Sequence, residues 1–390
     1  FNAIIESVET GGVNVIDTAI NYRYQKSERV VGAALRYLLQ QNYKREELFV
    51  CSKIGYIPDC DFYSLILTCA ILTRKTQIKA SQDKFWLMSL FKEKGRSDHW
   101  VTFRLNLSKL EKSDIVGGVH CLAPSFLEDQ LQRSLNNIGV ETLDLLYLHN
   151  TAESQLPLIG YERYFDRLAV TGDLFTKLRV NRKRLSFVEA SHDNKIRSYG
   201  LATWVCFRAK PDEEKLYLSL QKVTELAKKV GGEKNNFKYI QVPLNIMMPE
   251  IFAEKWQEWE EIGKETIKEN LFQVARRCQI NVITSSPLLQ GTMIQLPLPT
   301  ELFYCTNLGA KHIQFARSIP AQALLSKTHY IFLLHLIFVY SNARGSEDQQ
   351  NVKKNLEVIQ YPPMSSEHFL DFLKPNRRKA KKDDVVEPDQ

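Results

Sequence analysis

Short apolar runs rich in β-branched residues alternate along this chain with longer segments of helical periodicity. The clearest runs cover residues 12–19, 48–53 and 143–150. Runs of this length and composition are typical of strands in a parallel sheet that helices cover on both faces. The pattern therefore predicts an α/β fold in which strands and helices follow one another.

The same alternation extends along most of the chain. Further strands are expected at residues 196–203, 239–244 and 282–284, and helices at residues 1–10, from 123 onward, at 213–230 and at 271–277. The helix at 213–230 carries apolar residues on one face and ends at Gly231-Gly232, a usual helix stop. Residues 254–269 are charged and contain two tryptophans. We expect this last segment to form a helical excursion over the sheet.

A polar residue stands at or just beyond the end of each of the first three predicted strands. Asp17 ends the first strand and Tyr22 follows it, Lys53 ends the second, and His149 ends the third. The carboxyl ends of parallel strands meet at one edge, where α/β barrels place their catalytic groups. We expect the four side chains to lie together there.

The chemistry of these four residue types is coherent. A phenol has a pKa of roughly 10, so it is a weak acid at neutral pH unless a neighbour stabilises its anion. A lysine ammonium beside it would lower that pKa, and an aspartate would hold the lysine charged and oriented. A histidine can polarise a carbonyl oxygen or share the proton transfer. Together they can protonate an oxygen that gains charge, as a carbonyl does when it accepts hydride from a nicotinamide.

Each of the four residues also has an ordinary structural explanation. Asp17 could cap a helix, Tyr22 could be a packing tyrosine, Lys53 a surface lysine and His149 a hydrogen-bonded core histidine. Tyr24 is a close neighbour that could take the place of Tyr22. For each residue taken alone, the structural explanation is favoured. Because all four residues stand at strand ends in this order, a functional site is favoured for the set.

Several motifs in the chain resemble the aldo-keto reductase family. They are Asn-Val-Ile-Asp-Thr-Ala at 14–19 with Asn21-Tyr22, Ser27-Glu28, Val-Gly-Ala-Ala-Leu at 31–35, residues 49–53, 143–149, 195–200 and 241–245, and Ser-Ser-Pro-Leu at 285–288 with Gly291. The resemblance covers most of residues 1–56, 113–206, 237–320 and 340–360. It implies a (β/α)8 TIM barrel that reduces aldehydes and ketones with NADPH or NADH. It also implies a catalytic tetrad of Asp17, Tyr22 as the acid, Lys53 and His149.

The resemblance also indicates where the barrel departs from the family. The family's first strand has no counterpart before Phe1, and the last strand is atypical, so we expect an incomplete barrel. The expected organisation is one domain over residues 1–373, with an insertion at about 59–112 and an atypical segment at about 324–340, followed by a charged, disordered tail at 374–390. Phe338-Val339-Tyr340 could replace the last strand. The atypical segments are either real insertions or errors of the gene model, and the sequence leaves both open.

Cofactor-binding residues follow from the same resemblance. Gln241 stands where the family holds the nicotinamide carboxamide, although a polar strand cap would look the same. Thr203 and Ser285 stand at further strand ends, where Ser285 replaces a stacking aromatic. Arg344 and Ser346 fall in the expected phosphate loop, and Asn355 in the expected adenosine-facing helix. Because a guanidinium suits a 2′-phosphate, Arg344 favours NADP, unless it is simply an exposed loop arginine.

Composition narrows the function classes. The 390 residues are 44% hydrophobic and 25% charged, as in ordinary globular proteins. The net charge of +7 comes partly from two basic runs that lack interleaved aromatic residues, which argues against a nucleic-acid partner. No apolar stretch reaches the roughly 18–20 residues that a membrane crossing needs. The resemblance implies a small-molecule carbonyl substrate and no metal site, and the oligomeric state stays open.

Seven cysteines without a Cys-x-x-Cys pair indicate reduced thiols and a cytoplasmic protein. Organellar targeting stays open, since the chain begins at Phe1. The sequence thus predicts an NADP(H)-dependent oxidoreductase, a carbonyl reductase or its reverse alcohol dehydrogenase. The alternatives are a non-enzymatic, cofactor-binding regulatory protein on the same fold and an inactive truncated product.

Overall fold

The computed structural model describes residues 1–57 except 12, 110–178, and 195–289 except 214 and 234. Beyond these it describes residues 292–293, 298, 303–305, 307–323, 349–365 and 367–369. The expected insertion, apart from its last three residues, the atypical segment at 324–340 and the charged tail all lie outside the described residues. The predicted domain boundaries and the replacement of the last strand by residues 338–340 therefore stay predictions.

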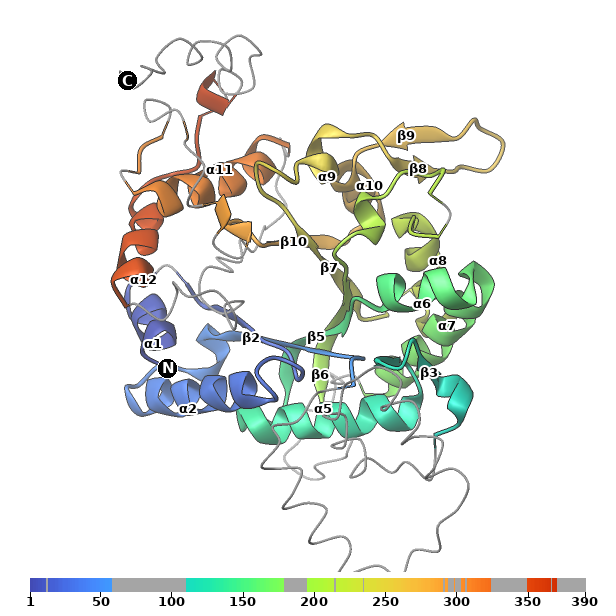
Figure 1. The fold of residues 1–390 in the computed structure, drawn as a ribbon, viewed down its shortest axis with the longest axis horizontal. Coiled ribbons are helices and arrows are strands. Elements are labelled where there is room, and N and C mark those ends of the chain that lie inside the picture. The colour runs from blue at the N-terminus through green and yellow to red at the C-terminus, as the bar shows by residue number, and fades with distance from the viewer. Residues whose placement is uncertain are drawn as a thin grey trace, which may run out of the picture.

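A curled sheet of six parallel strands forms the centre of the described structure (Figure 1). Its strands are β1 (Val15–Asp17), β2 (Phe49–Ile54), β5 (Leu143–His149), β6 (Ile196–Ala202), β7 (Phe237–Pro243) and β10 (Asn281–Ser285). They lie side by side in chain order, and every neighbouring pair is parallel. This is the strand arrangement of a (β/α)8 barrel, of which the described residues contain six strands. The predicted fold class, an incomplete TIM barrel, is confirmed.

Helices pack on the outer side of the sheet (Figure 1). They are α1 (Asn2–Glu9), α2 (Lys26–Gln40), α5 (Pro124–Ile138), α6 (Thr151–Ile159), α7 (Tyr161–Lys177), α8 (Leu220–Gly231), α9 (Glu250–Ala253), α10 (Leu271–Cys278), α11 (Leu308–Ala323) and α12 (Gln349–Leu356). Single helical turns occur at Arg45–Glu47, Lys112–Asp114, Cys206–Arg208 and Glu357–Gln360. In the part of the chain that the structure describes, no helix combines the length and the apolar character that crossing a membrane requires.

Local sequence signals set the helix ends. α5 has proline at its first position and is followed by Gly139, whose φ of 76° suits a residue without a side chain. α10 begins with a capping box, in which Asn270 and Gln273 each accept a backbone N–H of the other. These signals fix where α5 begins and ends and where α10 begins.

Apolar side chains fill both sides of the sheet. The outer side packs against the helices in one continuous cluster. A second, smaller cluster lies on the other side, toward the middle of the curl, and includes Val15, Cys51, Tyr147, Ala202 and Ile283. Strands with apolar residues on both faces are what the sequence pattern predicted.

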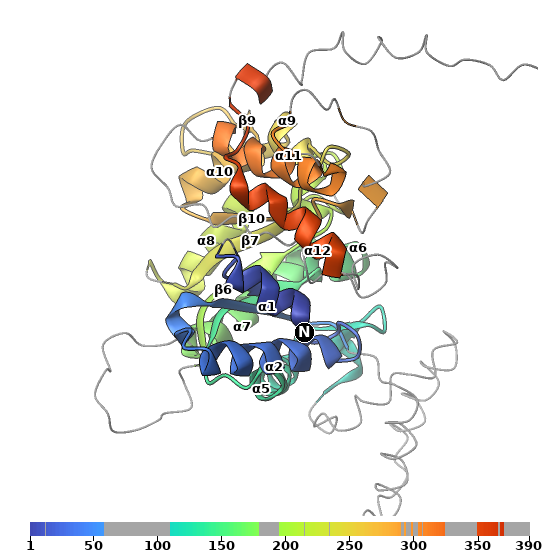
Figure 2. The same cartoon turned by 90° about the vertical axis from the view of Figure 1, so that its left-hand side faces the viewer.

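The two edge strands, β1 and β10, are linked through helices. α12 lies beside α1 (Figure 2), and the Lys353 ammonium is 3.4 Å from a Glu6 carboxylate oxygen. Val13, before β1, shares an apolar cluster with Leu288, after β10, and with Ile313 of α11. The outer layer of helices therefore continues from one edge strand to the other in the described residues.

Two expectations about local structure are wrong. Residues 254–269 contain a hairpin of β8 (Gln257–Trp259) and β9 (Ile267–Glu269), not a helix. Gln257 is buried beneath the hairpin while its neighbours are half-buried, and Gly263 with φ 77° lies in the turn. The helix expected at 213–230 begins only at Leu220, because Ser219 caps it by accepting the Lys222 N–H.

Candidate active site

Three of the predicted polar residues lie at one edge of the sheet, at the ends of three neighbouring strands. Asp17 is the last residue of β1, Lys53 is the fifth of six in β2, and His149 is the last residue of β5. β2 lies between β1 and β5 in the sheet. Because parallel strands end on the same side, the three side chains lie at a common edge, and the turn after β1 adds Tyr22.

Lys53 connects Asp17 and Tyr22. Its ammonium forms an ion pair with the Asp17 carboxylate, donates to the Thr18 carbonyl at 3.1 Å and lies 3.5 Å from the Tyr22 hydroxyl. Lys53 and Asp17 are each only 1% exposed. A buried charge is tolerated when it is paired and hydrogen-bonded, and this lysine has both kinds of partner.

His149 lies against the same tyrosine. The rings of Tyr22 and His149 meet edge to face, with centroids 5.6 Å apart. His149 is buried, and its Nδ1 has no hydrogen-bond partner within the described residues. Burial, with the nearby Lys53 charge, holds the pKa of His149 well below its ordinary value. The imidazole is therefore neutral near pH 7.

Burial dominates the ionisation of Tyr22. It raises the pKa of the phenol, and the Lys53 charge opposes this without reversing it. The expected lowering by Lys53 is therefore present but outweighed. Burial also favours the neutral form of Lys53, yet the Asp17 carboxylate, with Tyr22, holds the pKa of Lys53 above its ordinary value. The charged pair is thus Asp17 and Lys53, while Tyr22 keeps its proton.

A left-handed turn separates Tyr22 from Tyr24. Arg23, Tyr24 and Gln25 have φ of 49°, 58° and 68°. A run of non-glycine residues in this region is unusual and costs energy. The turn leaves the Tyr24 side chain 43% exposed, whereas Tyr22 lies next to Lys53. The geometry therefore singles out Tyr22 and not Tyr24.

Three of the predicted cofactor residues stand together at the ends of β6, β7 and β10. The Thr203 N–H donates to the Gln241 carbonyl at 2.9 Å, and Gln241 pairs with Ile283 two residues before Ser285. The Gln241 amide donates to Asp17 at 3.4 Å, which links this group to the tetrad. The Thr203 hydroxyl is buried without a partner in the described structure, so it is available to a bound ligand.

Glu153 of α6 fixes the loop after Thr203. Its carboxylate accepts the backbone N–H groups of Trp204 and Val205. Asn355 lies half-buried in α12, which packs on α1 and α11. Arg344 and Ser346 lie outside the described residues, so the structure places neither.

Sequence reasoning missed two aromatic side chains that pack around His149. The Tyr56 ring meets the His149 ring edge to face at 5.1 Å, and His120 lies against Tyr56 at the same centroid distance. His120 belongs to none of the motifs named above, so the sequence gave no signal for it. Tyr56 lies three residues after Lys53, and its place near a strand end could have marked it.

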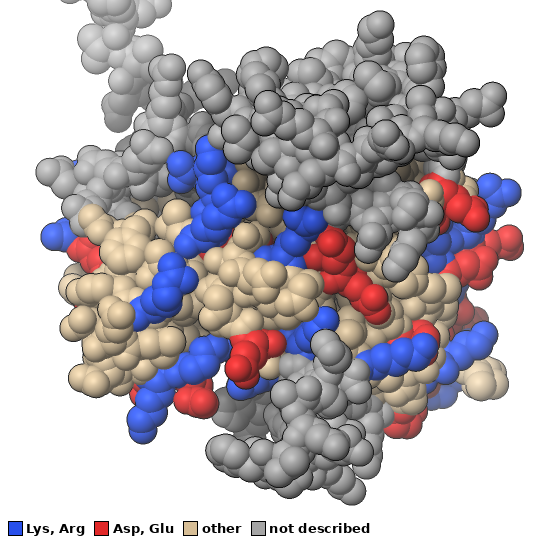
Figure 3. Space-filling view, turned by 90° about the horizontal axis from the view of Figure 1, so that it is seen from below, with Lys and Arg blue, Asp and Glu red and all other residues tan. Residues whose placement is uncertain are grey.

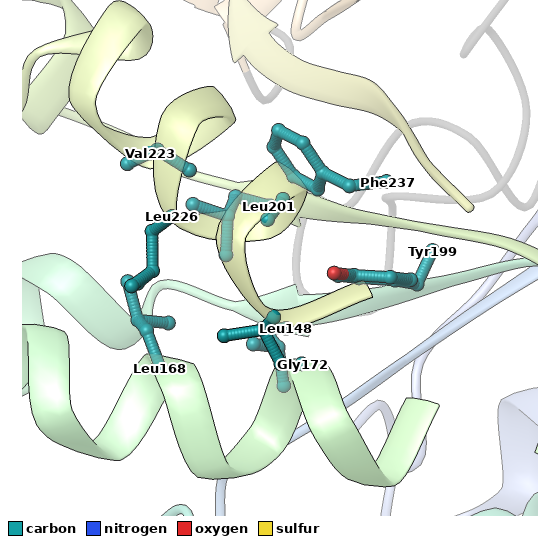
Figure 4. Close-up of a pocket in the computed structure, with 10 residues that line it drawn as sticks. Leu148, Leu168, Gly172, Tyr199, Leu201, Val223, Leu226 and Phe237 are labelled. Carbon is teal, nitrogen blue, oxygen red and sulfur yellow. The ribbon is translucent and has the colours of Figure 1, made fainter. Parts of the chain in front are cut away.

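A cavity elsewhere in the molecule does not belong to this site. It measures about 20 Å³ and lies between the outer side of the sheet and helices α7 and α8 (Figure 4). Its lining includes Leu168, Gly172, Tyr199 and Leu226. It is apolar and no larger than a water or two would fill, so it is a packing gap and not a substrate site.

Residues 2–172 match the model of the Aldo/keto reductase family. No curated protein sequence matches the chain. Among solved structures, an aldo-keto reductase of Bacillus halodurans in its holo form is 14% identical, with a TM-score of 0.47, over 95% of this chain and 86% of its own. An aldose reductase of Schistosoma japonicum is 14% identical, with a TM-score of 0.45, over 95% and 81%. An aldo/keto reductase of Klebsiella pneumoniae in complex with NADP and acetate is 13% identical, with a TM-score of 0.42, over 95% and 82%. Because the TM-scores are below 0.5, these structures give no evidence about the substrate or the cofactor of this chain.

Proposed function

We propose that this chain, whose residues 2–172 match the aldo/keto reductase family, reduces an aldehyde or ketone to an alcohol with NADPH, or catalyses the reverse reaction. The family match supports an oxidoreductase of the aldo-keto reductase type. The observation that carries the finer proposal is the contact of the Tyr22 hydroxyl with the Lys53–Asp17 pair beside His149.

Tyr22 is the proton donor in this proposal. Its raised pKa keeps the phenol protonated at neutral pH, which is the state that a general acid needs. NADPH, when bound, supplies the hydride to the carbonyl carbon. The carbonyl oxygen then gains charge, and Tyr22 gives it a proton.

Lys53 and Asp17 support the donor. Once Tyr22 has released its proton, the Lys53 ammonium at 3.5 Å stabilises the phenolate electrostatically. Asp17 holds Lys53 charged and in place, because the pair is buried. The cation therefore acts mainly on the ionised form of Tyr22, which develops during reaction.

His149 orients the carbonyl. A neutral imidazole carries one N–H, which can donate to the carbonyl oxygen without adding a second cation beside Lys53. The ring already lies edge-on to Tyr22, so a carbonyl oxygen between them would contact both.

Thr203, Gln241 and Ser285 are proposed to hold the nicotinamide end of the cofactor. The unpartnered Thr203 hydroxyl and the strand-end position of the Gln241 amide suit the donors and acceptors of a carboxamide. Arg344, Ser346 and Asn355 are proposed for the phosphate and adenosine end, on the family resemblance alone. Within the described residues, the thiols of Cys51, Cys121, Cys206 and Cys278 form no disulfide bond, which supports a reducing, cytoplasmic environment.

The test compares Tyr22→Phe with Tyr24→Phe in the full chain. Removing the Tyr22 hydroxyl should lower kcat for reduction of a panel of aldehydes and ketones by at least about 10²-fold, the usual size of a lost general acid. NADPH binding, followed by tryptophan fluorescence, should survive. Tyr24→Phe is the matched control, since Tyr24 is exposed, and it should behave as wild type. Unchanged turnover in Tyr22→Phe would reject the proposal.

A further inference from the structure

A second buried histidine stands next to the proposed active site. His120 begins β4 (His120–Cys121), which pairs with β3 (Ile115–Val116) in a short hairpin before α5. Its side chain is fully buried. It has no role in the proton transfer or in cofactor binding as proposed above.

Both ring nitrogens of His120 are engaged within the protein. Nε2 lies 3.0 Å from the backbone carbonyl oxygen of His149, and Nδ1 lies 3.0 Å from the side-chain nitrogen of Gln155. A carbonyl can only accept, so Nε2 carries the hydrogen and donates it to His149, and Nδ1 accepts from Gln155. With both nitrogens occupied, His120 has none left for a substrate.

The same ring packs against the end of the strand that carries Lys53. A Cβ atom on Gly55 would lie 2.7 Å from the His120 ring, and Gly55 has φ of +118°. Only glycine suits this place, because a side chain would meet both a strained backbone and the imidazole. The Cys121 N–H also donates to the Gly55 carbonyl at 2.9 Å. His120 therefore touches the ends of β2 and of β5 at once.

Side chains of two helices, α6 and α7, hold His120 in place. Gln155 of α6 accepts a hydrogen bond from Arg167 of α7 through its side-chain oxygen, at 3.4 Å. The same guanidinium donates to the backbone carbonyls of Ser113 and Asp114, just before the hairpin. A continuous series of hydrogen bonds thus runs from α7 through Gln155 and His120 to the backbone of His149.

The backbone at the receiving end makes a left-handed turn. Asn150, directly after His149, has φ of 48°. Asparagine adopts this conformation more readily than other residues with a side chain, and hydrogen bonds on both sides hold the turn here. The Asn150 N–H donates to the Ala202 carbonyl at 2.7 Å, and the His120 bond fixes the carbonyl on the other side of the same turn.

We propose that His120 is a positioning residue: its hydrogen bond to the His149 carbonyl sets the direction in which the His149 imidazole faces Tyr22. The proposal rests on the function proposed above, because it gives His149 its orienting role. It differs from that proposal in needing no cofactor or substrate for its first test.

The first test follows the His149 ring by NMR in the full chain, with histidines labelled with ¹⁵N and the His149 signal assigned through His149→Asn. Its titratable and charged neighbours are Asp17, Lys53, Tyr22, Tyr56 and His120, and only His120 is changed. In His120→Phe the anchor is lost, the ring loosens toward solvent, and its pKa should rise by at least about one unit toward the ordinary value of roughly 6.5. In His120→Gln a side-chain amide can donate to the same carbonyl, so most of the wild-type titration should return.

Phe175→Leu is the control for general destabilisation. Phe175 is fully buried in α7 and packs on Tyr199, away from His149. Its truncation should lower the melting temperature and leave the His149 titration as in wild type. A His149 titration that is the same in His120→Phe as in wild type would overturn the positioning role.

The second test measures carbonyl reduction with NADPH. His120→Phe should lose at least about 10-fold in kcat with little change in KM for NADPH, while His120→Gln stays within a few-fold of wild type. Equal kcat in His120→Phe and wild type would also count against the proposal. If wild type reduces no carbonyl but the His149 titration moves as described, the proposed function fails and the positioning by His120 stands.

Discussion

At the scale of single residues, burial shifts two acid–base groups of the site in opposite directions. It raises the pKa of the Tyr22 phenol and lowers the pKa of the His149 imidazole, because it favours the neutral form of each. Near neutral pH, only Asp17 and Lys53 in the tetrad are charged. The site therefore offers a proton donor and a neutral hydrogen-bond donor without changing its charge over a wide range of pH.

This assignment predicts the pH profile of kcat/KM for reduction, which reports the free enzyme. The profile should be flat from about pH 6.5 to about pH 10, because His149 loses its proton below this range and Tyr22 above it. The rate should fall only at higher pH, as Tyr22 ionises. A fall centred near pH 7–8 would show that another group controls the reaction.

Buried His120 predicts a loss of stability in acid. Burial lowers its pKa from 6.5 to about 4. The unfolded chain therefore binds a proton below about pH 6.5 that the folded chain does not bind until about pH 4. Its stabilising contribution is complete above pH 6.5 and is lost as pH falls through this window, to a limit of about 3 kcal/mol.

The measurement for this prediction is urea unfolding at pH 7 and pH 4.5, in wild type and in His120→Gln. Burial raises the carboxyl pKa values of Glu28 and Glu153, so these two residues stabilise the fold at pH 4.5 relative to pH 7. Their contribution is the same in wild type and variant. The quantity to compare is therefore the difference in unfolding free energy between the two proteins at each pH. A variant that loses as much stability in acid as wild type would contradict the assignment.

At the scale of elements, the sequence predicted those strands and helices that a local pattern of apolar and polar residues determines. The strands that end at Asp17, Lys53 and His149 were visible as apolar runs, and their polar ends indicated a common edge. The hairpin at 257–269 was missed, because strands of three residues are too short to show a period of two. His120 was missed because its partners, His149 and Gln155, are 29 and 35 residues away, and only folding brings them together.

Two helical glycines give a prediction of opposite sign for the same substitution. At Gly172 in α7, a Cβ would sit beside the apolar cavity, 3.5 Å from the Tyr199 hydroxyl, an ordinary contact. Gly172→Ala should therefore raise the free energy of unfolding by about 0.5–1 kcal/mol, through lower unfolded-state entropy and better helix propensity.

At Gly32 in α2, the same atom would lie 2.5 Å from the Ile138 carbonyl oxygen of α5. Two helices approach closely there, so Gly32→Ala should lower stability by about 1–3 kcal/mol. Urea unfolding of both variants checks the pair. A gain in Gly32→Ala would show that α2 and α5 can separate without cost.

At the scale of the whole molecule, the two ends of the sheet have different tasks. Asp144, at the opposite end of β5 from His149, accepts the Val50 N–H and pairs with Arg45 and Arg197. This end of the sheet therefore stabilises the fold, and the other end carries the proposed chemistry.

The described residues form no patch of a single charge sign on the face seen in Figure 3. Basic and acidic side chains lie interspersed there, as on an ordinary solvated surface.

Removing the Asp144 carboxylate tests this division. Asp144→Ala leaves the buried Val50 N–H without its acceptor and removes one partner from each of two guanidinium groups, so stability should fall by about 2–4 kcal/mol. Carbonyl reduction per folded molecule should stay within a few-fold of wild type, since the tetrad lies at the other end of the strands. Unfolding curves and kcat at low temperature check both parts. A large loss of kcat in fully folded protein would contradict it.

The most direct test of the account is the fate of the hydride. The full chain would be incubated with an aldehyde and NADPH that carries deuterium at both hydrogens of nicotinamide C4, and the alcohol analysed by mass spectrometry and NMR. We predict one deuterium on the carbinol carbon in wild type, and a product yield lower by at least about 10²-fold for Tyr22→Phe under the same conditions. Alcohol that lacks the label, or equal labelled yield in Tyr22→Phe, would contradict the claim that this site reduces carbonyls with Tyr22 as the acid.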